Sequence, residues 1–307
     1  MTTRATTPQP AATSGAETVF VKWKSPEEEL TGLAALLFAL TASGAHRAEN
    51  LCLAVANRNW AVQLQRACTQ VDVRTSICMA PARLKDDARL ALAKLDAIAH
   101  PQNAEAQSTL QGLGVSEEQA AKLVSTYAGA RSFALARVLG LSGMPVFANA
   151  LLHVTGEEDA GGLQAVLLEQ LRRPTPPADS PLSPIVDFRH IPGTYDWVFL
   201  VGCVDGLMPS PAALEDPDLQ RRGARRAAER GAFVQAPGHA RRTCVFSAFS
   251  KIDAALAQQA HIHTTRTKLE HGTRMGLCAP SSFLEAFGDA RPSTTGGQAF
   301  LRSYNLN

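Results

Sequence analysis

The stretch YDWVFLVGCVDGLMPS, residues 195 to 210, decides the fold. Apart from Asp196, its first eight residues are apolar, aromatic or glycine. Such a run is typical of a strand buried on both faces, as in a parallel sheet covered by helices. The polar, glycine-containing turn that follows comes at the carboxyl end of this strand, where open α/β sheets bind their ligands. The stretch therefore predicts a parallel-sheet strand with a functional edge directly after it.

Strands and helices alternate upstream of this stretch. TVFVKWK (18–24) alternates as a half-buried strand does, and LCLAVA (51–56) and VDVRTSI (71–77) have the composition of further strands. Ser25 and Glu28 form a predicted capping box, in which Ser25 caps a helix and Glu28 reaches back to the cap. Strands that alternate with helices indicate βαβ units and a parallel sheet.

Residues 83–183 interrupt the sheet pattern with helical periods and form a predicted inserted subdomain. The clearest helices are 86–100, 116–130 and 161–173. PTPPADSPLSP (174–184) has the composition of a return linker, after which strand-like IVDFRH (185–190) resumes the sheet. We therefore expect an α/β domain over 18–82 and 184–290, a helical insertion over 83–183, a disordered tail over 1–17 and a second tail over 291–307.

Composition limits the possible functions. The 307 residues are 45% hydrophobic, enough for a sizeable core, and the net charge is +2. This near balance gives no global attraction to nucleic acid or membrane, so such binding needs a local patch. Six cysteines without a CxxC pair predict reduced core thiols. No apolar run approaches the ~20 residues that span a bilayer, and residues 1–17 lack the hydrophobic centre of a signal peptide. We expect a soluble, cytoplasmic protein without a membrane partner.

The strongest basic cluster is RRGARRAAERGAFVQAPGHARR (221–242), which contains seven arginines and one acid, Glu229. As a helix it would carry several arginines and Glu229 along one side, where they could bind phosphates in a salt-dependent way. The alternative is a solvated helix whose charge is balanced by EDPD (215–218). The candidate nucleic-acid-binding residues are Arg221, Arg222, Arg225, Arg226, Arg241 and Arg242.

No pattern in the sequence predicts a catalytic residue or a metal site. HIH (261–263) places two imidazoles on one face of a predicted strand, but no nearby Cys, Asp or Glu completes a ligand set, which favours an edge-strand pair. The sequence has no nucleophile elbow and no Gly-Lys dipeptide, so it lacks the phosphate loop of nucleotide triphosphatases.

Residues 195–210 and four further segments carry a resemblance to a known family. Residues 195–210 are similar to the strand and turn after motif V in the second motor domain of UvrD/Rep-type superfamily 1 DNA helicases. In the same order, 25–59 resemble the start of the domain with motif IV, 88–106 the entry to its inserted helical subdomain, 241–251 motif VI, and 279–287 the closing motif. The resemblance covers residues 18 to 290 and implies a RecA-like fold.

What the resemblance implies is half a motor. In that family ATP lies between two RecA-like domains, and the second domain supplies arginines that stabilise the transferred phosphoryl group. Arg58 and Gly193 align with nucleotide-binding positions of motifs IV and V, and Arg189 or His190 stands for the motif V histidine. Ser250 replaces the arginine of motif VI, and a serine cannot offer phosphate a bidentate cation. ATP and magnesium are therefore expected only if a partner motor domain completes the site.

The expected function follows from the missing phosphate loop and the missing motif VI arginine. We expect a UvrD-like helicase C-terminal domain protein without autonomous ATPase activity, a DNA-repair or recombination accessory. It would bind DNA, or a separate helicase or nuclease subunit that carries the first motor domain. Two alternatives remain open: the split half of an active ATP-dependent DNA helicase, which makes Arg58 important, and an interaction module without a nucleic-acid role.

Overall fold

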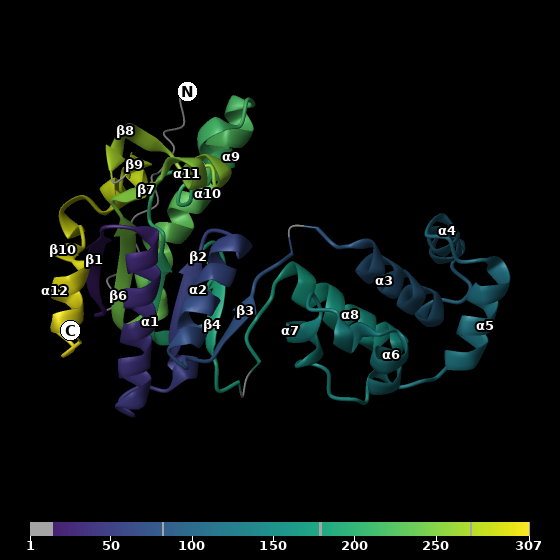
Figure 1. Cartoon of the computed structure of the whole chain (residues 1–307). Helices are drawn as coiled ribbons and strands as arrows, with labels where there is room; N and C mark the ends of the chain where they lie inside the picture. The colour runs from purple at the N-terminus through teal and green to yellow at the C-terminus, as the bar shows by residue number, and fades with distance from the viewer. Residues whose placement is uncertain (1–14, 82, 178–179, 271, 307) are drawn as a thin grey trace, which may run out of the picture. The chain divides into compact units, whose positions relative to one another are not determined.

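The structure, a computed structural model, describes residues 15–81, 83–177, 180–270 and 272–306 (Figure 1). The chain divides into two compact units, one formed by residues 1–77 and 181–307 and the other by residues 78–180. The second unit begins and ends a few residues before the limits of 83 and 183 predicted for the helical insertion.

The first unit is built on a seven-stranded sheet with the strand order β10-β1-β6-β5-β2-β4-β3. The pairs with a described register are all parallel. The predicted α/β fold class, a parallel sheet flanked by helices, is therefore confirmed. The strands are β1 (Glu17–Trp23), β2 (Leu51–Val55), β3 (Thr75–Cys78), β4 (Ser183–Asp187), β5 (Tyr195–Val201), β6 (Ala240–Phe249) and β10 (Ser293–Gly296).

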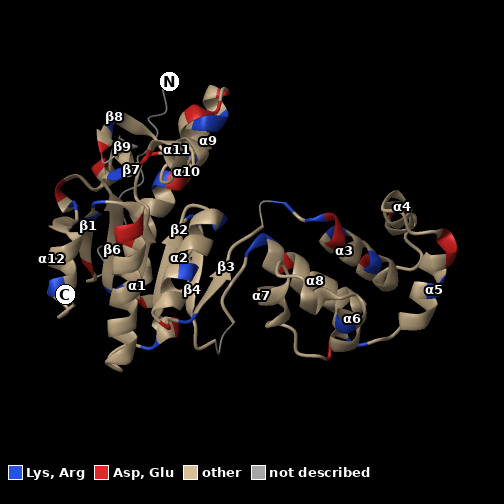
Figure 2. Cartoon of the chain, in the orientation of Figure 1, with Lys and Arg blue, Asp and Glu red and all other residues tan. Residues whose placement is uncertain are grey.

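Strand β5, the start of the stretch that predicted the fold, lies between β6 and β2 in the middle of the sheet. All of its residues are buried except Asp196, which is half-buried. Burial on both faces explains why this strand is apolar throughout. Figure 2 shows that the charged residues of the main sheet lie near the ends of its strands, away from the apolar middle.

Helices cover both faces of the sheet. Phe249 of β6 stacks on Trp60 with ring centroids 5.6 Å apart, whereas Phe246 packs on Phe233 at 5.0 Å. Because successive side chains of a strand point to opposite faces, Trp60 and Phe233 lie on opposite sides of the sheet. The helix that carries Trp60 packs beside α1, and Phe233 belongs to α10. The helices of this unit are α1 (Pro26–Ala42), α2 (Arg58–Gln70), α9 (Pro211–Glu215), α10 (Leu219–Gln235), α11 (Ala254–Gln259) and α12 (Gly297–Arg302), with 3₁₀ turns η1 (Ala48–Asn50), η3 (Ala236–His239) and η4 (Ser282–Ala290).

The start of α1 differs in one detail from the predicted capping box. Ser25 Oγ accepts a hydrogen bond from Glu28 N at 3.3 Å, as expected for an N-cap. The Glu28 carboxylate, however, accepts from Lys24 N at 2.8 Å. Its side chain thus reaches one residue beyond the cap and ties the helix to the end of β1.

The predicted tail at 291–307 is wrong for most of its length. Val19 to Lys22 of β1 pair with β10, and α12 packs against α1 and β1. A Cβ on Gly297 would collide with the Trp23 ring, so this close packing requires glycine. The sequence did not predict this strand because STTG (293–296) is short and has no large apolar residue.

A small antiparallel sheet, which the sequence did not predict, follows β6. Its strand order is β7-β9-β8. Strand β8 is exposed along most of its length, so it lacks the apolar alternation that would mark it. The strands are β7 (Lys251–Asp253), β8 (Thr264–Glu270) and β9 (Thr273–Cys278).

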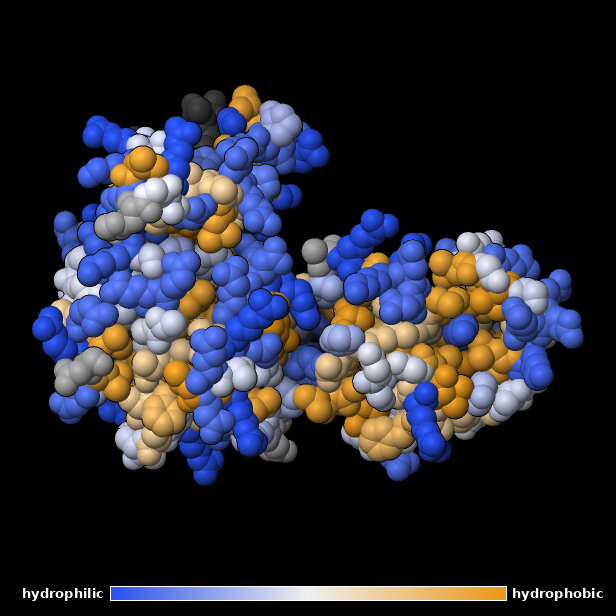
Figure 3. Space-filling view, viewed as in Figure 1, coloured by the Kyte–Doolittle hydropathy of each residue, from blue (hydrophilic) through white to orange (hydrophobic). Residues whose placement is uncertain are grey.

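The second unit is helical, as predicted. Its core contains Leu95, Leu135, Phe147, Leu163 and Leu167. Its surface also carries large apolar side chains, including Phe133 and Leu152, which are 60% and 61% exposed, and Figure 3 shows apolar residues on the viewed face of this unit. Its helices are α3 (Asp86–Ala99), α4 (Ala104–Gly112), α5 (Glu117–Tyr127), α6 (Ser132–Val138), α7 (Ala148–Leu151) and α8 (Ala160–Arg172), with the 3₁₀ turn η2 (Leu141–Gly143).

Candidate functional site

The carboxyl ends of the parallel strands meet at one edge of the main sheet, called here the carboxyl edge. Ala56 directly follows β2, Asp187 ends β4, Gly202 directly follows β5, and Ser250 directly follows β6. Open α/β sheets bind ligands at this edge. It is therefore the first place to look for a site.

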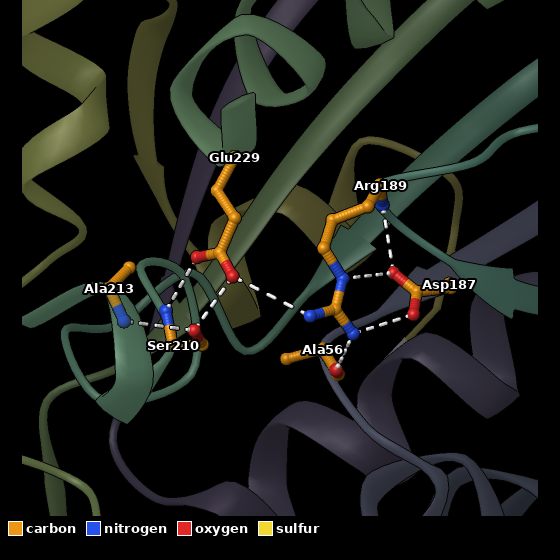
Figure 4. Close-up of polar contacts among 6 residues, drawn as sticks. All are labelled: Ala56, Asp187, Arg189, Ser210, Ala213 and Glu229. Carbon is orange, nitrogen blue, oxygen red and sulfur yellow. Dashed lines mark hydrogen bonds and ion pairs between the residues drawn. The ribbon is translucent and has the colours of Figure 1, made fainter. Parts of the chain in front are cut away.

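Arg189 lies at the carboxyl edge in a compact polar cluster (Figure 4). Its Nε and Nη2 donate to the two oxygens of Asp187 at 2.8 and 2.6 Å, and Nη2 also donates to Ala56 O at 3.2 Å. Its Nη1 is 3.5 Å from Glu229 Oε1. The hydrogen bonds that Arg189 donates to Asp187 and the charges of both carboxylates raise the pKa of Arg189 above its usual value, against the effect of burial. Two carboxylates thus compensate this guanidinium, which makes it a poor phosphate ligand.

Glu229 joins α10 to the end of the 195–210 stretch. Its carboxylate accepts hydrogen bonds from Ser210 N at 2.8 Å and from Ser210 Oγ at 2.7 Å (Figure 4). The residue is 1% exposed. The helical spacing predicted Glu229 on one side of the helix with several arginines, where these residues could bind phosphates, but the Glu229 carboxylate is buried. The side chain points into the protein because Ser210 and Arg189 bind it there.

Glu29, in the first turn of α1, holds the other end of the same turn. Its Oε1 accepts hydrogen bonds from Gly202 N at 3.0 Å and from Ser247 Oγ at 2.6 Å. Ser247 Oγ in turn accepts from Trp23 Nε1 at 2.8 Å. Complete burial raises the pKa of Glu29 to about 7, although the bonds from Ser247 and Gly202 oppose the rise. The turn 202–210 is thus held at both ends by buried carboxyl groups.

Sequence reasoning missed both of these carboxyl groups. Glu29 looked like an ordinary acid in the first turn of a capped helix. Its partner Ser247 is 218 residues away, and Glu229 is 19 residues from Ser210. The one available signal was Gly202, whose φ of +80° belongs to a region that favours glycine.

The two predicted nucleotide-binding residues lie at opposite edges of the sheet. Arg58 begins α2, just after the carboxyl end of β2, whereas Gly193 precedes β5. Strands β2 and β5 are parallel neighbours, so the start of β5 lies at the amino edge. The Gly193 carbonyl accepts a hydrogen bond from His239 Nδ1 at 2.7 Å, and its φ is +79°, as suits a turn glycine. The structure does not bring Arg58 and Gly193 together.

Ser250 stands where the resemblance predicts the motif VI arginine, and neither Ser250 nor its neighbour Lys251 offers a free cation in its place. Ser250 Oγ donates to Lys24 O at 3.3 Å. The next residue, Lys251, has its Nζ 2.7 and 2.9 Å from the carboxylate oxygens of Glu270. Its charge is therefore paired within the small antiparallel sheet.

The six candidate nucleic-acid-binding arginines form two groups. Arg241 and Arg242 directly follow Ala240, the first residue of β6, and lie at the amino edge. There Arg241 donates a hydrogen bond to Thr194 Oγ1 at 3.1 Å and lies 3.5 Å from Asp196. The other group, Arg221, Arg222, Arg225 and Arg226, lies in the first half of α10 (Figure 2). These residues are exposed except Arg222, which is half-buried. The two groups therefore do not form one patch.

The first half of α10 is strongly cationic. The helix contains five arginines, the fifth being Arg230, and its one acid is the buried Glu229. Among the described residues, only Arg221 of these five forms an ion pair, with Asp218 at 3.0 Å. The acids of 215–218 thus neutralise little of the helix, and Glu215 lies instead 2.8 Å from His263 Nε2.

The HIH segment does not form a strand. His261 has a φ of +55° in a turn, and His263 pairs with Glu215, so the predicted edge-strand pair is wrong. In the described parts of the chain, no three His, Cys, Asp or Glu side chains gather as metal ligands would.

No protein-family model matches the chain, and neither does any curated protein. Within the described residues, no helix has the length and apolar character needed to cross a membrane.

Proposed function

We propose that this chain is a non-autonomous DNA-binding accessory of repair or recombination, derived from a second motor domain of the UvrD/Rep type. The observation that carries the proposal is the burial of Glu229. With this carboxylate turned toward Ser210 and Arg189, the solvent-facing charges of α10 are all arginines. Such a surface attracts the phosphates of a nucleic acid despite a nearly neutral chain.

The spacing on α10 suits contact with a phosphate backbone. Arg221 and Arg225, and likewise Arg222 and Arg226, are four residues apart and neighbours on the helix surface. Neighbouring cations repel one another in the free protein, and phosphates relieve this repulsion. Arginine also bonds phosphate with two parallel N–H groups. The first half of α10 is the proposed DNA surface.

The cations at the carboxyl edge support an accessory role over independent ATP hydrolysis. Arg189 is bound to Asp187 and lies beside Glu229, while Lys251 is bound to Glu270. The sequence supplies no phosphate loop. ATP and magnesium belong to the proposal only where a partner subunit contributes the first motor domain.

Arg58 favours a second candidate, the split half of an active helicase. It begins α2 at the carboxyl edge, the edge at which a composite nucleotide site would form. A partner with a phosphate loop would complete such a site.

Fluorescence anisotropy with a labelled single-stranded oligonucleotide tests the main proposal. The full chain should bind at low salt, and its association constant should fall linearly with salt on logarithmic axes, because each neutralised phosphate releases counterions. Absence of binding at low salt would overturn the DNA-binding role. In that case a pull-down with a first motor domain would test the second candidate.

A further inference from the structure

Two buried polar atoms lie beside Gly202 without a hydrogen-bond partner among the described residues: Glu29 Oε2 and Trp60 Nε1. Gly202 N donates to the other oxygen of Glu29 at 3.0 Å. A Cβ at Gly202 would lie 3.0 Å from Trp60 Nε1. Both unpartnered atoms therefore belong to the surroundings of one residue, at the start of the 202–210 turn.

The groups known to contact these residues are already used or offer no acceptor. The hydroxyl group of Ser247 can donate only one hydrogen bond, and it donates this bond to Glu29 Oε1. Its oxygen accepts a hydrogen bond from Trp23 Nε1. The backbone N–H of Gly202 is also used by Oε1. Trp60 stacks on Phe249, which offers no acceptor in its side chain. Because buried polar groups are nearly always hydrogen-bonded, a further partner is required.

The chemistry of the two atoms selects the ligand. The indole N–H of Trp60 can only donate, so it repels a metal cation. A carboxylate disfavours an anion. The Glu29 oxygen needs a donor when the group is ionised and an acceptor when it is protonated. A small neutral molecule that both donates and accepts meets all of these demands.

We propose that a single internal water molecule binds beside Gly202, accepting a hydrogen bond from Trp60 Nε1 and bonding Glu29 Oε2. This water joins the first turn of α1 to the first turn of α2 at the carboxyl edge. Gly202 has a second reason to be a glycine at this place, because a side chain here would crowd Trp60 and Leu207. The site is independent of the proposed DNA binding.

Nuclear magnetic resonance of the protein with ¹⁵N-labelled tryptophan tests the site directly. The chain has three tryptophans, and two provide internal controls: Trp23 Nε1 donates to Ser247 Oγ at 2.8 Å and Trp197 Nε1 to His46 Nε2 at 3.3 Å. The Trp60 indole proton should show cross-relaxation with a long-lived water, and the other two should not. The signal is assigned by its loss in Trp60→Phe.

Two variants at Glu29 complete the test. Glu29→Gln keeps a donor and an acceptor and should retain the water signal at Trp60, whereas Glu29→Leu should lose it. A parent protein whose Trp60 proton shows no water signal would overturn the proposal, as would a direct bond between Trp60 and Glu29 in a crystal structure. An undiminished signal in folded Glu29→Leu would contradict the role of Glu29 in holding the water.

Discussion

Glu229 Oε1 accepts a hydrogen bond from Ser210 Oγ at 2.7 Å, and this bond fixes the basic helix α10 to the end of the turn that follows the central strand β5. At the other end of that turn, Glu29 accepts from Gly202 N at 3.0 Å. The two carboxyl groups come from helices on opposite faces of the sheet. The turn at the carboxyl edge is thus hydrogen-bonded to both helical layers.

Ser210→Ala should lower the free energy of unfolding by about 1–3 kcal/mol, because it leaves a buried carboxylate oxygen short of a donor and removes the cap of α9. Urea denaturation followed by circular dichroism measures the change. Ser125→Ala, whose hydroxyl bonds only Lys122 O on an exposed helix surface, is the control and should stay within about 0.5 kcal/mol. Equal losses of unfolding free energy in both variants would contradict a stabilising role for the hydrogen bonds between Ser210 and Glu229.

Glu29 should make the stability depend on pH. Its pKa is about 7 in the folded protein against a usual value of 4.5, so the folded state binds more protons between these values. The contribution is fully present below about pH 4.5 and is lost as pH rises through about 7. At 1.36 kcal/mol per pH unit, the loss is about 3 kcal/mol.

Glu29→Gln removes this titration while keeping an acceptor for Gly202 and Ser247. Its unfolding free energy, measured in urea from about pH 5 to about pH 8, should vary less than that of the parent protein. Parallel profiles for the two proteins would show that Glu29 does not titrate in this range.

Arg189→Ala should lower the free energy of unfolding by about 1–2 kcal/mol, because Asp187 and the buried Glu229 lose their charged partner. The loss is moderate because the Arg189 side chain is partly exposed and solvent screens its charge. Arg189→Lys should not restore the loss fully, since a lysine cannot make the paired contact with Asp187. Neither change should alter the salt dependence of DNA binding. A large effect on DNA binding would instead place Arg189 in the interface.

The purified chain should hydrolyse no ATP above background, with or without single-stranded DNA. The physical reason is the lack of a phosphate loop, together with the pairing of Lys251 with Glu270. Release of phosphate is the measurement. DNA-stimulated turnover that survives further purification and vanishes in Arg58→Ala would contradict this prediction.

The sequence predicted those parts of the fold that have a strong local pattern. The apolar run of β5 indicated a buried parallel strand, and helical periods marked the inserted unit. Strands β8 and β10 were not predicted because they are short or exposed and carry few apolar residues. Their formation depends on partners far away in the chain.

The candidate site was less predictable because its contacts are set by the tertiary fold. Glu29 and Ser247 are separated by 218 residues, and no local pattern relates them. The direction in which Glu229 points also depends on Ser210, beyond the end of its own helix. The separation of Arg58 from Gly193, by contrast, could have been anticipated, since one follows a strand and the other precedes a parallel neighbour.

The salt dependence of DNA binding in the variant with Arg221, Arg222, Arg225 and Arg226 all changed to Ala tests the central claim most directly. A control variant changes two exposed arginines elsewhere, Arg66 on α2 and Arg137 on α6, to Ala. On single-stranded DNA each phosphate contact contributes about 0.7 to the logarithmic salt slope, so the fourfold variant should lose at most about three units of slope and bind more weakly. The control should keep the slope of the parent, and circular dichroism should show both variants folded, because exposed arginines contribute little to stability. An unchanged slope in the folded fourfold variant would contradict the assignment of the DNA surface to α10.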